Sequence, residues 1–240
     1  MTKLQTVKSK ISNFIYHYKW HTLIVLFFTF VITIMAVQMC TRNEFDLNVM
    51  YAGPEIVSDA ENAAVEDALL QIANNGVDAD KQKKNAALYD LLVLNEEQLG
   101  QIYEQYGATV SSQTVQKNRE TFYYQVLTDD FFLLFLSPEC YTTYRQQDCI
   151  VPLKSMGIDQ MDIYGMRNDD YSFLLSDLDC SVFYTAFKAF PKDTVVCIKR
   201  LNTMNKGNGK EMQKDHIDLF KKMLAFELPA DFIPPEQNAQ

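Results

Sequence analysis

The hexapeptide FFLLFL, residues Phe131–Leu136, is the strongest strand candidate in the chain. A short run that is apolar at every position is typical of a strand covered on both faces inside a layered domain. Ser137, Pro138 and Glu139 come next and predict the start of a helix, because Pro is favoured at the first helical position. Residues 113–128, ahead of the strand, are expected to form another helix. This order of elements is a first indication of an α/β fold.

Three further strands are expected outward from this point. Residues 45–51 alternate apolar and polar side chains with the period of two that marks a strand. Residues 86–94 are apolar almost throughout and suit a strand covered on both faces, with a helix as the open alternative. Residues 194–201, TVVCIKRL, predict a strand, whereas residues 151–170 predict loops and short pieces. Strands that alternate with helices predict an α/β domain with a mainly parallel sheet flanked by helices.

Short polar signals mark where helices begin. Ser58 and Glu61 form a capping-box pattern, and Asn95 is expected to cap a helix that runs through Tyr106. Residues 211–226 predict an amphipathic helix. The apolar side chains on its inward face are Met212, Ile217, Phe220, Met223 and Leu224.

Residues 20–39, WHTLIVLFFTFVITIMAVQM, contain no Asp, Glu, Lys or Arg. Twenty residues in a helix rise about 30 Å, which matches the hydrocarbon core of a bilayer. We therefore expect a transmembrane helix, with Lys19, Trp20 and Arg42 at the membrane interfaces. The lysines of residues 1–19 favour a cytoplasmic N-terminus, so the chain beyond the helix is expected outside the cell membrane.

Two alternatives to this signal anchor remain open. A cleaved signal peptide has a shorter apolar region and a small-x-small cleavage site, and no clear site of that kind precedes Cys40. A lipoprotein would carry its lipid on Cys40, but Val37, Gln38 and Met39 lack the small residues expected before such a cysteine. The preferred interpretation is an anchor that stays attached.

The rest of the chain suffices for one domain. Residues 45–228 are expected to form an extracytoplasmic α/β domain, and the proline-rich residues 229–240 a flexible tail. All 31 Asp and Glu lie beyond residue 40, with all but four of the 22 Lys and Arg, so the formal charge there is 18 minus 31, or −13. This charge argues against nucleic acid as a partner.

The domain contains four cysteines, Cys140, Cys149, Cys180 and Cys197. An oxidising exterior permits disulfides, and the short spacing of Cys140 and Cys149 suggests one bridge. The preferred interpretation is four buried or idle thiols, because Cys197 lies in an apolar strand where cysteine packs as a small apolar residue. No CxxC pair is present, so a zinc site is not expected.

Three stretches together carry a resemblance to a known family. They are LNVMYAGP at residues 47–54, a helix containing residues 122–127 followed by DDFFLL at 129–134, and FPKDTVV at 190–196. In this order they resemble part of an extracytoplasmic solute-binding protein of bacterial ABC transporters, which has the two-lobed periplasmic-binding fold. With the basic tail and the apolar helix, the chain also looks like uncharacterised single-span proteins of Gram-positive bacteria. The resemblance implies recognition of a solute or a transporter permease. The chain is shorter than two-lobed members, and its anchor is protein instead of lipid.

Catalytic signatures are missing from the domain. HExxH, GxSxG and Ser-x-x-Lys do not occur, and the glycine-rich residues 206–210, expected to be a loop, lack phosphate-loop spacing. His216 is the only histidine beyond the apolar helix, and its charged neighbours predict a solvated helix surface. No catalytic, cofactor-binding or metal-binding residue is therefore predicted.

Pairs of neighbouring carboxylates are the remaining candidates for catalytic groups. Two carboxyl groups at the right separation hydrolyse glycosides, but neighbouring acids are usually caps, turns and solvated faces. The pairs in question are Asp129 with Asp130, Asp169 with Asp170, and Asp177 with Asp179.

Four residues are candidate ligand contacts. Tyr51 ends the first strand, Tyr123 and Tyr124 are aromatic platforms suited to a sugar, and Asp130 belongs to an acidic pair. The leading hypothesis is a non-enzymatic, single-pass membrane protein whose domain recognises a small solute, a permease or another envelope protein. A structural or assembly partner without ligand binding is the alternative, and a carboxylate-based hydrolase a minor one. About four or five strands predict one principal sheet and an open groove.

Overall fold

The computed structural model describes residues 18, 20–21, 23–35, 45–95, 97–100, 104, 111–202 and 209–232. The chain divides into two compact units, residues 1–44 and residues 45–240. Among the expected features, Tyr106, the loop at 206–208 and residues 233–240 of the tail lie outside the described residues.

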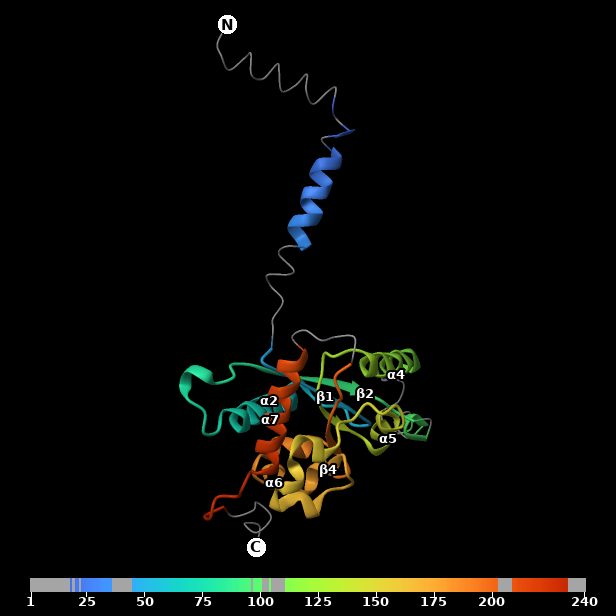
Figure 1. Cartoon of the computed structure of the whole chain (residues 1–240). Coiled ribbons are helices and arrows are strands. Elements are labelled where there is room, and N and C mark those ends of the chain that lie inside the picture. The colour runs from blue at the N-terminus through green and yellow to red at the C-terminus, as the bar shows by residue number, and fades with distance from the viewer. Residues whose placement is uncertain are drawn as a thin grey trace. The chain divides into compact units, whose positions relative to one another are not determined.

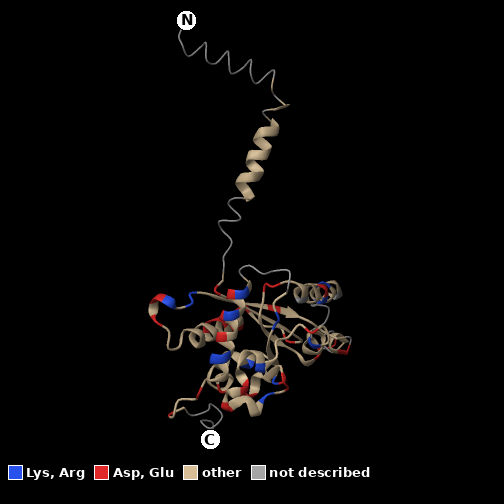
Figure 2. Ribbon diagram, viewed as in Figure 1, with Lys and Arg blue, Asp and Glu red and all other residues tan. Residues whose placement is uncertain are grey.

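In the first unit, residues 23–35 form a helix that carries no charged residue (Figure 2). No helix among the described residues is long and apolar enough to cross a membrane. Lys19, residues 36–39, Cys40 and Arg42 lie outside the described residues. The transmembrane helix therefore stays a prediction.

The described part of the second unit contains one five-stranded sheet with the strand order β2-β1-β3-β5-β4. Figure 1 labels its strands β1, β2 and β4. Its strands are β1 (Leu47–Gly53), β2 (Ala86–Leu92), β3 (Leu133–Leu136), β4 (Ser172–Leu174) and β5 (Val195–Ile198). The main helices are α2 (Asp59–Asn74), α4 (Ser112–Leu127), α5 (Pro138–Gln146), α6 (Asp179–Phe183) and α7 (Gly209–Leu224). The strands and helices expected around residues 131–136 are thus confirmed, and so is an α/β fold with one principal sheet.

The expectation of a mainly parallel sheet is wrong, because the sheet is mixed. β1 pairs in parallel with β2 and β3, whereas β5 runs antiparallel to both β3 and β4. A parallel neighbour needs a long crossover, usually a helix, that returns the chain to the opposite end of the sheet. The connection from β4 to β5 holds only 3-10 turns and the five-residue helix α6. β5 therefore enters the sheet in the reverse direction.

Helices cover both faces of this sheet. Successive residues of a strand point to opposite faces, so β1 contributes to two apolar cores. Val49 and Tyr51 pack on the side of α2 and α7, and Met50 and Ala52 pack on the side of α4 and α5. β3 covers only the last four residues of FFLLFL and is buried at every position, whereas Phe131 is only half-buried and precedes the strand.

β2 lies at an edge of the sheet and is less covered than its apolar sequence suggested. Tyr89 is 40% exposed. Helix side chains occupy part of the open edge: Glu66 accepts the N–H of Leu88 at 2.9 Å, and Asn118 donates to the carbonyl of Leu92 at 3.2 Å. These contacts satisfy groups that would otherwise offer pairing to another strand.

The predicted helix starts are confirmed by their hydrogen bonds. Ser58 and Glu61 form the reciprocal capping box, with the N–H of Ser58 donating to the Glu61 carboxylate at 2.9 Å. Asn95 and Gln98 make the same reciprocal exchange at 2.7 and 2.9 Å. Ser137 caps α5.

The four cysteines of the second unit are free thiols in the described structure, and Cys140, Cys180 and Cys197 are buried. Burial raises the pKa of Cys140 to about 11 and that of Cys180 to about 12. Both thiols therefore stay protonated and weakly reactive near neutral pH.

Candidate functional site

The structure does not bring the four predicted ligand contacts together. Tyr51 is fully buried on the α2 side of the sheet, where its ring centroid lies 4.8 Å from that of Phe190. Tyr123 and Tyr124 are 49% and 63% exposed on α4, which covers the opposite face. Asp130 is exposed in the bend before β3. Tyr51 is thus separated by the sheet from the two exposed tyrosines. Of the expected membrane-interface residues, only Trp20 is described, and it is 69% exposed.

Asp129 is not the solvated turn acid that its sequence suggested. Its side chain is 1% exposed and that of Lys199 is 2% exposed, and the carboxylate Oδ1 lies 3.3 Å from the Lys199 Nζ. The backbone N–H of Asn202 donates to the same Oδ1 at 3.0 Å. Burial lowers the pKa of the Lys199 ammonium although Asp129 acts to raise it. The pair is inaccessible to a solute.

His216 is likewise buried, contrary to the prediction of a solvated helix surface. Its Nδ1 lies 2.7 Å from the carbonyl oxygen of Met212, and its Nε2 lies 2.8 Å from the carbonyl oxygen and 3.1 Å from the backbone nitrogen of Asn48. Asn48 pairs with β2, but the β1–β3 ladder begins one residue later, at Val49. The imidazole thus bonds a β1 backbone group that lies beyond the end of β3. It joins α7 to the sheet, and burial lowers its pKa.

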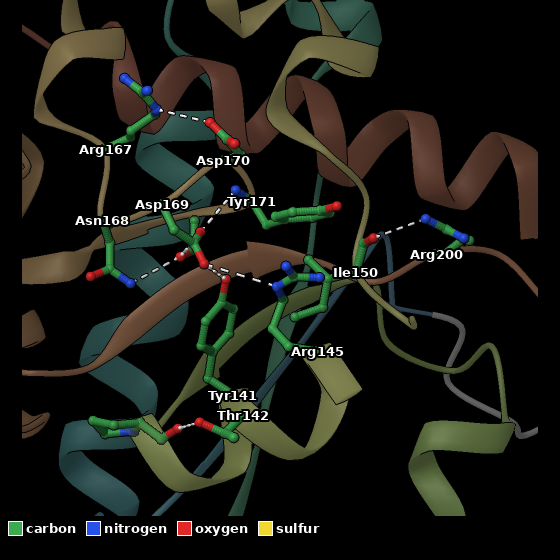
Figure 3. A network of polar contacts seen from close by, with 12 residues as sticks. Tyr141, Thr142, Arg145, Ile150, Arg167, Asn168, Asp169, Asp170, Tyr171 and Arg200 are labelled. Atoms are coloured by element: carbon green, nitrogen blue, oxygen red, sulfur yellow. Dashed lines mark hydrogen bonds and ion pairs between the residues drawn. The ribbon is translucent and has the colours of Figure 1, made fainter. Parts of the chain in front are cut away.

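Asp169 is the centre of a second polar cluster, called here the Asp169 network (Figure 3). Its Oδ2 accepts the hydroxyl of Tyr141 at 2.5 Å, and its Oδ1 accepts the N–H of Tyr171 and the hydroxyl of Ser172, both at 2.8 Å. The Arg145 guanidinium lies 3.4 Å over the ring of Tyr171, and its Nε is 3.9 Å from Oδ2. The network ties the turn before β4 to α5.

The hydrogen bonds to Asp169 indicate a structural role for its carboxylate and not a role in acid–base chemistry. Both of its oxygens already accept hydrogen bonds, and burial raises the pKa of Tyr141, with the bond to Asp169 adding to the effect. Its neighbour Asp170 is exposed and pairs with Arg167 at 3.3 Å. Asp129 and Asp169, the first acid of two of the three acidic pairs, therefore make structural contacts, whereas Asp130 and Asp170 are exposed.

The third pair, Asp177 and Asp179, lines a groove of about 520 Å³, called here the acidic groove. It lies between the turns at residues 160–166, the start of α6 and the segment after α7. Its lining residues all belong to the described part of the chain, and none of them is Lys or Arg. They are Gln160, Met161, Asp162, Ile163, Met166, Asp177, Asp179, Leu224, Ala225, Phe226 and Glu227.

Apolar side chains and carboxylates therefore line the same open groove. The sequence singles out Asp177 and Asp179 as an acidic pair. The two methionines of the groove come from residues 151–170, where the sequence pattern is weak, and Phe226 comes from the segment after α7. No sequence motif links these three segments. Only the tertiary fold brings them to one site.

Among the described residues, no group of three or more His, Cys, Asp and Glu gathers closely enough to hold a metal ion. Comparisons of the chain with models of protein families, with curated proteins and with solved structures find no match. The chemistry of the groove is thus the main guide to function.

Proposed function

We propose that residues 45–228 form an extracytoplasmic recognition domain, anchored by residues 20–39, whose acidic groove binds a ligand or envelope protein through a cationic group. The observation that carries the proposal is the groove itself. A volume of about 520 Å³ falls within the range of ligand pockets, and a mixture of apolar walls with a few polar groups is typical of them.

Electrostatics supports a cationic partner. The groove is lined by Asp162, Asp177, Asp179 and Glu227 without a lining Lys or Arg. Acidic and basic residues are interspersed over the second unit (Figure 2), but the chain beyond residue 40 carries a formal charge of −13. A charged cleft on a like-charged protein concentrates and steers partners of the opposite sign.

The presence of a single sheet favours an open binding surface and not a cleft that closes around its ligand. A two-lobed solute-binding protein encloses its ligand by hinge closure, whereas the described chain provides one sheet and a groove at its side. Partial enclosure favours a partner that brings its own surface, such as a transporter permease or another envelope protein, over a lone small solute.

The binding test uses the full chain in detergent and a set of cationic probes, namely a polyamine and Lys- or Arg-rich peptides, with calorimetry at low and high salt. We expect binding that weakens about tenfold in an Asp177→Asn, Asp179→Asn double variant and also at high salt. Asp78→Asn with Asp80→Asn is the matched control, because these acids are exposed on a separate turn. Binding by neither probe class, or equal loss in the control, would contradict the proposal.

The topology has a separate test. In a cysteine-free chain, a cysteine placed at Asp78 is expected to react with a membrane-impermeant reagent on intact cells, and one placed at Gln5 is not. Reaction at position 5 would reverse the orientation. An N-terminus at or after Cys40 in the mature protein would instead show a cleaved signal.

A structural or assembly role without ligand binding is the second candidate, and one observation favours it. Tyr123, Tyr124 and Leu127 are 49%, 63% and 67% exposed on α4, and residues three or four apart share a helix face. Exposed aromatic patches often mark protein interfaces. Loss of a co-purifying partner in a Tyr123→Ala, Tyr124→Ala variant, with no effect of the groove variant, would support this role over the first.

A further inference from the structure

Two reactive side chains meet in the interior at the end of β5. Lys199 is the residue directly after that strand, and Asp129 lies in the bend between α4 and β3. Their side chains are 2% and 1% exposed, and Nζ is 3.3 Å from Oδ1. Lys199 Nζ also donates to the carbonyl of Thr128. An amine and a carboxyl group are thus held at contact distance with water excluded.

The charged form of this pair is poorly compensated. Burying two charges costs several kcal/mol per ion unless hydrogen bonds satisfy the remaining atoms. Asp129 Oδ2 is buried and has no hydrogen-bond partner in the described structure. Transfer of one proton from Nζ to the carboxyl group gives a neutral amine and a neutral acid, which are the forms that react with each other.

The two oxygens of Asp129 have different surroundings. Oδ1 accepts the N–H of Asn202 at 3.0 Å, so a negative charge that develops on this oxygen meets a fixed donor. Oδ2 has no such donor in the described structure. The first oxygen is suited to become the oxyanion of a tetrahedral intermediate, and the second to leave.

We propose that Lys199 and Asp129 condense into an isopeptide bond. The neutral Nζ attacks Cγ of Asp129, and the carbonyl electron pair moves onto Oδ1. The intermediate collapses, the Cγ–Oδ2 bond breaks, and Oδ2 leaves as water with its own hydrogen and one from Nζ. The amine loses one hydrogen, the acid loses one hydroxyl group, and the product amide carries no charge. The step needs no oxidant and no co-reactant.

The bond would act as a covalent staple. It links residues 70 positions apart in the sequence, across the β3–β5 pair, in a unit whose four described cysteines form no disulfide. Closing a long loop restricts the unfolded chain and stabilises the fold. The inference does not depend on the proposed binding function, because it needs only the interior geometry.

Mass spectrometry of the full chain tests the proposal. The intact protein is expected to be lighter than its sequence by one water molecule, and a protease digest should contain a branched peptide that joins Lys199 to Asp129. Mapping in the wild-type chain does not depend on how any variant folds. Full sequence mass, or a branch at another pair of residues, overturns the proposal.

Variants sharpen the test. Lys199→Ala is expected to restore the full sequence mass. Lys83→Ala is the matched control, because the Lys83 and Asp215 side chains are also in contact at 2.5 Å but are 31% and 32% exposed, so that water reaches both groups. The control should keep the loss of one water molecule. Loss of the mass difference in the control, or its persistence in Lys199→Ala, would show that another site reacts.

Discussion

Asp129 and Asp169 begin two Asp-Asp pairs that look alike in the sequence, yet they lie in different surroundings. The side chain of Asp129 is 1% exposed and faces the buried Nζ of Lys199, with one carboxylate oxygen left without a partner among the described residues. Asp169 is 37% exposed and accepts hydrogen bonds from a tyrosine, a serine and a backbone N–H. In both pairs the second acid, Asp130 or Asp170, is exposed.

The difference indicates that burial, and not the mere presence of an ion pair, determines how much stability is lost when one partner is removed. Water screens charges near the surface, so partly exposed pairs contribute little to stability. In the interior, removal of one partner leaves an uncompensated charge and costs far more. The two clusters therefore respond differently to mutation, pH and salt.

The largest effect is expected at Asp129. Asp129→Ala leaves Lys199 buried without its partner and should lower the free energy of unfolding by about 3–5 kcal/mol. Urea denaturation followed by near-UV circular dichroism of the tyrosines measures it, since the only tryptophan, Trp20, lies outside the domain. Asp130→Ala is the control and should change stability by less than about 0.5 kcal/mol. Equal effects of the two variants would remove the distinction between the clusters.

His216 should rank second, although its sequence predicted a solvated residue. His216→Ala removes the partner of the Asn48 backbone and opens space beneath α7. An unsatisfied buried polar group costs about 1–3 kcal/mol, and we expect a loss of this size in the same assay. Lys214→Ala, an exposed position of the same helix, is the control. A loss below about 0.5 kcal/mol would mean that His216 is only a surface residue after all.

The pH dependence follows from the same residue. Burial lowers the pKa of His216 below its ordinary value of 6.5, so the unfolded chain binds a proton more readily than the folded chain. The contribution of the neutral, buried His216 to the free energy of unfolding is therefore fully present above pH 6.5. It falls as the pH drops toward the folded-state pKa, by about 1.4 kcal/mol per pH unit at most. Asp215 and Lys83 act on the same group in opposite directions. His216→Gln cannot titrate, and a slope that persists in this variant would assign the effect elsewhere.

The smallest effect is expected in the Asp169 network. Asp169→Asn keeps one acceptor oxygen but weakens the contacts with Tyr141 and Arg145, at a cost of about 1 kcal/mol. The same denaturation assay measures the change, with Asp170→Asn as a control that should be near neutral. A loss as large as that of Asp129→Ala would show that partial exposure does not protect this cluster.

Much of the fold could be predicted because it depends on local chemistry. The capping box of Ser58 and Glu61, the cap at Asn95 and the apolar hexapeptide at residues 131–136 each act within a few residues of chain. The inward face of α7 also follows its sequence period, with Phe220, Met223 and Leu224 buried as predicted. The predicted ligand contacts rest on residue type alone, and residue type cannot show that the sheet separates Tyr51 from Tyr123.

Local sequence patterns account for four of the five strands and for the main helices other than α6, and they also give the acidity of the domain and the lack of familiar catalytic signatures. The direction of β5 against β3, the burial of Asp129, Lys199 and His216, and the meeting of three distant segments at the acidic groove all arise from tertiary packing. The reason is one of range. Capping and periodicity act between residues a few positions apart, whereas strand direction and burial depend on which distant surfaces the packed chain brings into contact.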